Sequence, residues 1–151
     1  MEVRRRRFFP AIVQNTTEDE RVSLVRIVAR NTCPRTGTWL GAMANGRPAV
    51  ALRTLDAHDS AKRGKRKMHR MGSKEYPPVA CFPVAHVVLI SVGRFPQEDE
   101  EASHLCHSPT CINPAHLVWE RGDFNRRRRH CVREGECVCG LLPRCLLKAH
   151  E

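Results

Sequence analysis

Apolar residues near the start of the chain recur with the period of a helix. Between residues 18 and 30 they include Val25 and Val28, which fall on one face at a period of 3.6 residues. Thr17 and Glu20 precede and open this segment as a capping box, in which each side chain accepts from the backbone of the other. The pattern predicts an amphipathic helix over residues 18–30.

An Asn-Gly pair at 45–46 separates two extended segments, residues 36–44 and 47–55. This dipeptide suits a type I′ turn, so the segments are expected to form a β-hairpin. Arg47 and Arg53 fall on its second strand, and a two-stranded ribbon that carries arginines can enter the major groove of DNA. An ordinary exposed hairpin is the alternative that this segment leaves open.

From residue 79 onward the apolar segments are short and of mixed type. The acidic block 97–102 is expected to be a solvated loop, and the segment 131–151 contains no pattern for a long element. The predicted class is therefore α+β. In chain order the pattern predicts a strand over 79–82, a helix over 84–92 ending at Gly93, strands over 102–105 and 117–120, and a helix over 124–130 with Asp123 as N-cap.

The chain has 151 residues, which suits one domain with a modest core. We found no secretory signal and no run of ~20 apolar residues, so an intracellular protein without a membrane span is expected. In a reducing compartment eight cysteines favour metal binding over disulfides. The expected parts are a basic arm (1–15), a helix, hairpin and basic insertion (16–95), a region with His104, Asn125 and the first metal ligands (96–131), and a second metal knuckle (131–151).

The net charge is +10, from 26 basic and 16 acidic residues, and the excess lies in clusters at 4–7, 62–74 and 126–129. Such clusters are typical of a polyanionic partner, although a lone arginine run is often a solvated face or a nuclear-import signal. Three clusters near metal ligands favour nucleic acid. The residues expected to contact it are Arg47, Arg53, Lys65, Arg66, Lys67, Arg70, Arg126 and Arg127.

Cys106, Cys111 and His116 follow one another at five-residue intervals, which lets a loop fold around one zinc ion. A tetrahedral structural site needs a fourth ligand. Cys33 is favoured because it would tie the hairpin to the later half. Cys81 stays open as the alternative, although its apolar surroundings are those of a small buried side chain.

A second metal site is expected in the cysteine-rich segment near the end of the chain. Four cysteines lie close together between positions 131 and 145, in a segment without an apolar core, which would be hard to order without metal. Two disulfides are the alternative, and His130 or His150 could substitute for a cysteine. The expected ligands are Cys131, Cys137, Cys139 and Cys145.

Neither zinc site requires His104 or Asn125. Histidine titrates near neutral pH and can activate water as a general base. Asn125, on the predicted helix, offers a hard amide oxygen suited to Mg²⁺, and one base with one metal suffices for phosphodiester hydrolysis. The pair therefore indicates a nuclease.

The segment SHLCHSPTCINPAHLVWE at 103–120, with Asn125 and Cys131 downstream, resembles the His-Cys box homing endonucleases. These belong to the His-Me finger, or ββα-metal, nucleases related to the HNH group. The resemblance implies a small zinc-stabilised ββα-metal fold with an added DNA-binding β-ribbon. It also implies sequence-specific, Mg²⁺-dependent cleavage of double-stranded DNA by a homodimer.

The resemblance assigns roles to individual residues. His104 would be the general base, Asn125 would hold the single Mg²⁺, and Arg53 would be the arginine near the cleaved phosphate. Cys139 stands where the family has a histidine. The implied ligands are Cys33, Cys106, Cys111 and His116 for the first zinc, and Cys131, Cys137, Cys139 and Cys145 for the second.

Two other functions are compatible with parts of this pattern. A non-catalytic zinc module that only binds DNA or RNA shares the basic clusters and the cysteines, but it does not need His104 or Asn125. A secreted, disulfide-linked basic protein would bind no zinc. The nuclease interpretation places the protein inside the cell, in the nucleus.

Overall fold

The computed structural model of the chain describes residues 9–53, 68–69 and 79–151. The predicted contacts of Lys65, Arg66, Lys67 and Arg70 lie outside these residues, and of Arg53 only the backbone is described. The described elements are α1 (Ala11–Gln14), α2 (Glu18–Arg30), β1 (Met43–Ala44), β2 (Arg47–Arg53), β3 (Met68–His69), β4 (Val79–Pro83), α4 (Val84–Ser91), β5 (Glu100–His104), the 3₁₀ turn η1 (Pro114–His116), β6 (Leu117–Arg121) and α5 (Gly122–Glu134).

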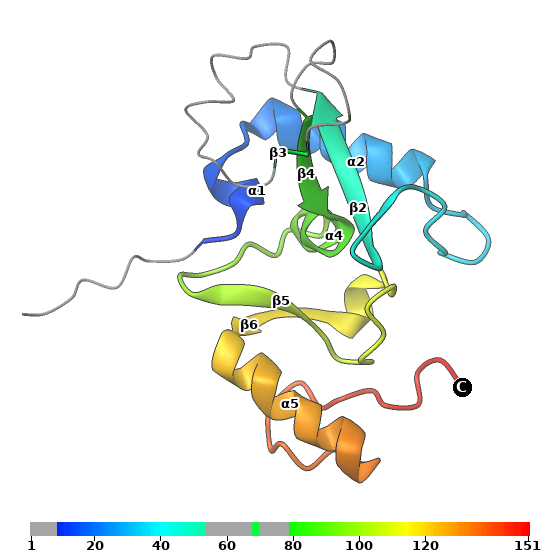
Figure 1. Cartoon of the computed structure of the whole chain (residues 1–151), viewed down its shortest axis with the longest axis vertical. Helices are drawn as coiled ribbons and strands as arrows, with labels where there is room; N and C mark the ends of the chain where they lie inside the picture. The colour runs from blue at the N-terminus through cyan, green and yellow to red at the C-terminus, as the bar shows by residue number, and fades with distance from the viewer. Residues whose placement is uncertain (1–8, 54–67, 70–78) are drawn as a thin grey trace, which may run out of the picture.

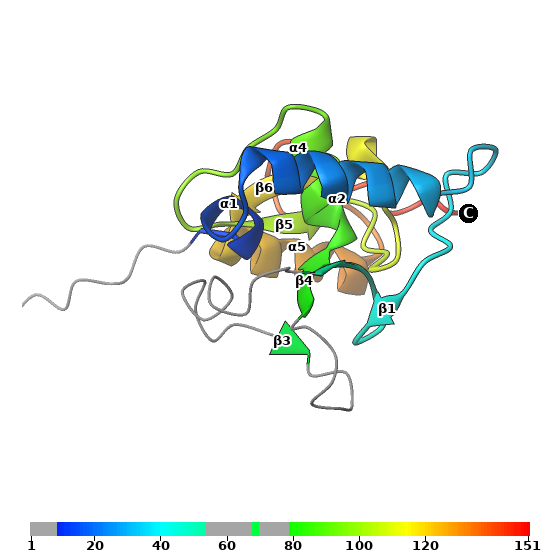
Figure 2. The same cartoon turned by 90° about the horizontal axis from the view of Figure 1, so that it is seen from above.

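Helix α2 confirms the predicted boundaries and capping box. The hydroxyl of Thr17 accepts from the backbone N–H of Glu20 at 3.2 Å, and the carboxylate of Glu20 accepts from the N–H of Thr17 at the same distance. The inward face of α2 buries Leu24 and Val28. Figure 2 shows α2 crossing α4, against which it packs.

The predicted two-stranded ribbon is only partly correct. Asn45 and Gly46 form the expected tight turn with φ of 52° and 73°, but the first strand is limited to β1. Residues 33–42 turn instead, because the N–H of Gly37 donates to the carbonyl of Cys33 at 2.8 Å and the indole of Trp39 donates to that of Ala42 at 2.9 Å. Strand β2 pairs mainly with β4, in a sheet of order β1-β2-β4-β3.

A second, two-stranded sheet and one helix follow the pattern expected after residue 96. β5 pairs antiparallel with β6, and α5 packs on this hairpin at the far end of the molecule (Figure 1). The predicted start of α5 was wrong. The helix begins at Gly122 with Arg121 as its N-cap, because the carboxylate of Asp123 accepts from the Arg121 side chain at 3.1 Å rather than capping a backbone N–H. It runs on to Glu134 and ends before Gly135, whose φ is 72°.

Helix α4 lies at the centre of the apolar core and confirms the predicted buried helix. It contacts α2, β2, β4, β6 and η1. Its side chains of Val84 and Leu89 are fully buried, and the same core includes Ile12 of α1 and Leu117 and Trp119 of β6. The core therefore joins the N-terminal helices to the hairpin that carries the site. None of the helices in the described part of the chain is long and apolar enough to cross a membrane.

Candidate metal centres and active site

Four metal-binding side chains meet around the loop between β5 and β6. The ligand atoms of Cys106, Cys111, His116 and His150 all lie within 4.8 Å of one another. The loop is closed at its base by the N–H of Leu105, which donates to the carbonyl of His116 at 2.8 Å. Two thiols and two imidazoles are a typical donor set for tetrahedral zinc.

The fourth member of this group is His150, whereas Cys33, the predicted fourth ligand, is not among its members. The chain after the second cysteine cluster returns to the loop, where the N–H of Leu146 donates to the carbonyl of Leu105 at 2.7 Å. This places the ring of His150 edge-on to His116, with 5.4 Å between their centroids. Neither Cys33, in the turn after α2, nor Cys81, in β4, belongs to a metal-binding group of the described residues.

The second group consists of the four predicted cysteines, Cys131, Cys137, Cys139 and Cys145, and all their thiols lie within 4.8 Å of one another. Backbone N–H groups already point at sulfur atoms. That of Val138 donates to Cys131 at 3.3 Å, and that of Cys145 donates to Cys137 at 3.4 Å. Such contacts stabilise thiolates, which are the form that binds zinc.

The thiol pKa values in both groups fit a metal-binding role. Burial raises the pKa of Cys111 to about 11 and that of Cys145 to about 12, because a thiolate loses solvation there. The N–H of Cys145 instead lowers the pKa of Cys137, to about 6. A bound Zn²⁺ provides the positive charge that stabilises closely packed thiolates. Two structural zinc ions therefore fit the two groups.

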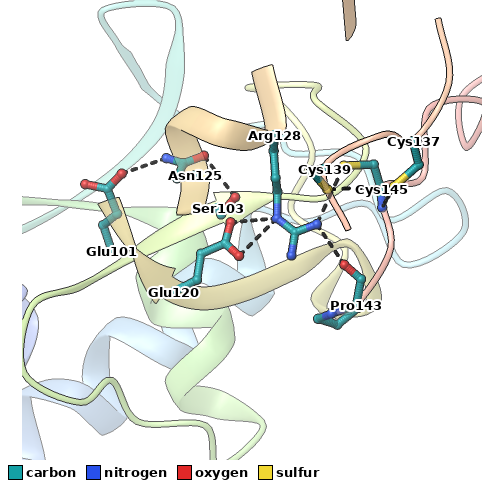
Figure 3. A network of polar contacts seen from close by, with 9 residues as sticks. All are labelled: Glu101, Ser103, Glu120, Asn125, Arg128, Cys137, Cys139, Pro143 and Cys145. Carbon is teal, nitrogen blue, oxygen red and sulfur yellow. Dashed lines mark hydrogen bonds and ion pairs between the residues drawn. The ribbon is translucent and has the colours of Figure 1, made fainter. Parts of the chain in front are cut away.

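Arg128 connects the second group to the hairpin, as Figure 3 shows. Its Nε donates to both carboxylate oxygens of Glu120, at 2.8 and 3.0 Å, and both side chains are buried. Its Nη1 donates to the carbonyl of Pro143 at 2.7 Å and approaches the sulfur of Cys145 at 3.6 Å. Arg128 of the basic cluster 126–129 is therefore buried and paired, whereas Arg126 and Arg127, the two residues of the cluster predicted to contact nucleic acid, are exposed.

His104 is the last residue of β5 and lines a pocket of about 310 Å³ together with Arg47 and His86. Its Nε2 lies 3.0 Å from the carbonyl oxygen of Cys111. A carbonyl only accepts, so Nε2 carries the proton and Nδ1 is the free base of the neutral ring. Burial, and to a lesser extent the charges of Arg47 and His107, lower the pKa of His104.

Asn125 is held on the other side of β5. Its Oδ1 accepts from the hydroxyl of Ser103 at 3.0 Å, and its Nδ2 donates to Glu101 at 2.7 Å (Figure 3). Successive strand residues point to opposite faces, so Ser103 faces α5 while His104 faces the pocket. Among the described residues, the hydrogen bonds of Asn125 and His104 go to different partners and none joins the two side chains. Amide, hydroxyl and carboxylate oxygens are nevertheless the donors that suit Mg²⁺.

Glu101 and Ser103, the partners of Asn125, were not singled out from the sequence, and His150 was considered only as a substitute for a cysteine in the second zinc site. The acidic block was expected to be a loop, but its second half is strand β5. Had the predicted strand 102–105 been extended by two residues toward the N-terminus, Glu101 and Ser103 would have been placed on the same face of it. No local signal distinguishes His150 from other exposed histidines, because its position depends on how the last residues fold back.

His86 of α4 leads to a prediction about stability at low pH. Its ring lies 5.0 Å from that of Trp119, and its buried Nδ1 has no hydrogen-bond partner among the described residues. Burial, with a smaller contribution from the charge of His104, lowers the pKa of His86 to about 4. The unfolded chain therefore binds this proton at a higher pH than the folded chain does.

The contribution of His86 to the free energy of unfolding is fully present above pH ~6.5 and is lost as the pH falls toward the folded pKa, by which point the loss amounts to about 3 kcal/mol. Urea unfolding of the wild type and of His86→Phe, which keeps a ring against Trp119, measures it. The wild type should lose stability relative to the variant between pH 6.5 and 4.5. Protonation of zinc ligands affects both proteins alike, and a difference in stability that stays constant with pH would contradict the prediction.

Residues 84–151 match the family model described as the zinc-binding loop region of homing endonuclease. The match begins at α4 and includes both groups of zinc ligands, His104 and Asn125. No solved structure gave a significant match to the chain. This match over residues 84–151 supports the resemblance of the chain to the His-Me finger homing endonucleases.

Proposed function

We propose that this chain is a Mg²⁺-dependent endonuclease that cleaves specific sites in double-stranded DNA, with His104 as general base. The observation that carries the proposal is the fixed orientation of this ring. The carbonyl of Cys111 holds Nε2, so Nδ1 faces away from the zinc loop with its lone pair free. The lowered pKa keeps the ring neutral near pH 7, as a base requires.

In the reaction, Nδ1 of His104 takes a proton from a water molecule while the water oxygen attacks phosphorus. The bond between phosphorus and the 3′ oxygen breaks, the 3′ alkoxide takes up a proton from water, and the histidine returns its own proton to solvent. When bound beside Asn125, Mg²⁺ would offset the charge that develops on the phosphate and the 3′ oxygen. His104 and Asn125 lie on opposite faces of β5. A phosphate that contacts both side chains must therefore lie at the end of this strand.

DNA contact in this proposal rests on exposed arginines. Arg47 lies at the start of β2 beside the pocket of His104, and Arg126 and Arg127 are exposed on α5. Arginine suits phosphate because its guanidinium donates two parallel hydrogen bonds. The homodimer, the nuclear location and a role for Arg53 at the cleaved phosphate remain part of the proposal.

Cleavage of a plasmid library that carries randomised inserts tests the function. With Mg²⁺ the wild type should linearise a subset of sequences, and His104→Ala should cleave them about 10²–10⁴ times more slowly. His130→Ala removes an exposed histidine of α5 and is the matched control. Undiminished cleavage by His104→Ala would exclude His104 as the general base. If the zinc-loaded wild type cleaved none of the inserts, the proposed nuclease activity would be excluded.

One observation favours a second candidate, a zinc module that binds DNA without cutting it. Both ends of the Asn125 amide already have protein partners, and the amide does not line the pocket of His104. Enrichment of specific inserts by binding, without their cleavage in Mg²⁺, would support this candidate.

A further inference from the structure

Three polar side chains, those of Glu101, Ser103 and Asn125, meet between β5 and α5 (Figure 3). Glu101 and Ser103 are two residues apart on β5, so their side chains share a face. Asn125 of α5 lies between them and bonds to both. Nothing in the zinc sites requires this arrangement.

The carboxylate of Glu101 determines which way the amide faces. The oxygen and nitrogen ends of an asparagine amide have nearly the same shape, so its partners decide the orientation. A carboxylate accepts but does not donate, so it selects the NH₂ end, at 2.7 Å. The oxygen end is thereby turned toward Ser103, whose hydroxyl can donate to it or rotate away to serve as an acceptor.

The fold leaves space for the Glu101 carboxylate at this position. A Cβ atom added to Gly122, at the start of α5, would lie only 3.3 Å from a carboxylate oxygen of Glu101 and 3.3 Å from Nη1 of Arg126. Across the hairpin, Glu101 is the strand partner of Glu120, whose charge is paired with Arg128. Arg128 therefore forms its ion pair with Glu120, while the carboxylate of Glu101 accepts a hydrogen bond from the Asn125 amide.

We propose that Glu101 is a positioning residue that presents the oxygen of Asn125 to the divalent cation. Without it the amide rotates freely and presents its NH₂ end, which cannot bind a cation, for part of the time. The proposal rests on the function proposed above, because it assumes that the cation binds at Asn125. It predicts an effect on cation affinity, whereas the rate at saturating Mg²⁺ should stay close to that of the wild type.

The test measures binding of Mn²⁺, a spectroscopic substitute for Mg²⁺, to the zinc-loaded protein by electron paramagnetic resonance. Glu101→Ala should weaken binding about 10–100-fold, as the loss of an orienting partner does at metal sites. Glu101→Gln should restore most of the affinity, because its carbonyl can also accept from the amide. Glu100→Ala is the matched control, since it removes the same charge from the neighbouring residue of β5 and should bind like the wild type.

Gly122→Ala provides an independent probe, because its methyl group displaces the Glu101 carboxylate without removing it, and binding should weaken. If Asn125→Ala weakens Mn²⁺ binding but Glu101→Ala does not, the positioning role is wrong while the cation site stands. Equal losses in Glu101→Gln and Glu101→Ala would also overturn it, since charge would then be the cause. If Asn125→Ala leaves Mn²⁺ affinity unchanged, the cation site itself fails.

Discussion

Removal of zinc is expected to unfold the region around the two metal groups, while α2 and α4 keep part of their packing. Residues 135–151 contain no helix or strand, and half of the buried side chains of the zinc loop are ligands, Cys106 and Cys111, beside Leu105 and Ile112. Zinc binding contributes about 10–16 kcal/mol in small zinc-folded peptides. Nuclear magnetic resonance spectra recorded during titration with a strong chelator would follow the loss, and added zinc should reverse it.

The zinc content of the protein and its variants tests which residues bind each ion. By elemental analysis the wild type should hold two zinc ions per chain, one for each group. His150→Ala should weaken or empty the first site, whereas Cys33→Ala should keep both ions. His130→Ala provides the matched control for loss of an exposed histidine. Loss of one zinc from Cys33→Ala, with His150→Ala unaffected, would reverse the assignment made from the structure.

Replacing Arg128 by methionine is expected to destabilise the protein by about 3–5 kcal/mol, the usual cost of leaving a buried charge without its partner. Glu120 would lose both hydrogen bonds, and the carbonyl of Pro143 would lose its donor. Urea unfolding of the zinc-loaded protein measures the change. Arg129→Met alters an exposed residue of the same helix and should change stability by less than about 0.5 kcal/mol.

A double variant separates the ion pair from the remaining contacts of Arg128. Glu120→Leu added to Arg128→Met removes the orphaned carboxylate, so part of the stability should return. The part that does not return belongs to the contacts with Pro143 and Cys145. If Arg128→Met costs no more than Arg129→Met, the buried pair does not stabilise the fold.

Features that depend on neighbouring residues could be predicted from the sequence. The capping box and apolar face of α2 are encoded within one segment, and its boundaries were correct. The second cysteine group was correct as a set because all its members belong to the short segment 131–145. Helical periodicity could also have identified Arg128, because Asn125, Arg128 and Cys131 recur at every third position along the inner face of α5.

Features that depend on distant contacts could not be predicted in the same way. Whether Cys33 or His150 completes the first group depends on how the last residues fold back, which no local pattern encodes. The short β1 has a similar cause, since β2 finds its main partner in β4, which begins only at Val79. Glu101 was missed because an acidic run resembles a solvated loop until its helix partner is known.

The closure of the first zinc group by His150 sets an order of events during synthesis. With Cys33 as fourth ligand the group would be complete once residue 116 had left the ribosome. With His150 it stays open until the whole second group has also emerged, since Cys131 to Cys145 precede it in the chain. A segment made after both cysteine groups therefore closes the zinc loop next to His104, and a ribosome-bound fragment that ends before residue 150 would hold His104 on an unfinished scaffold.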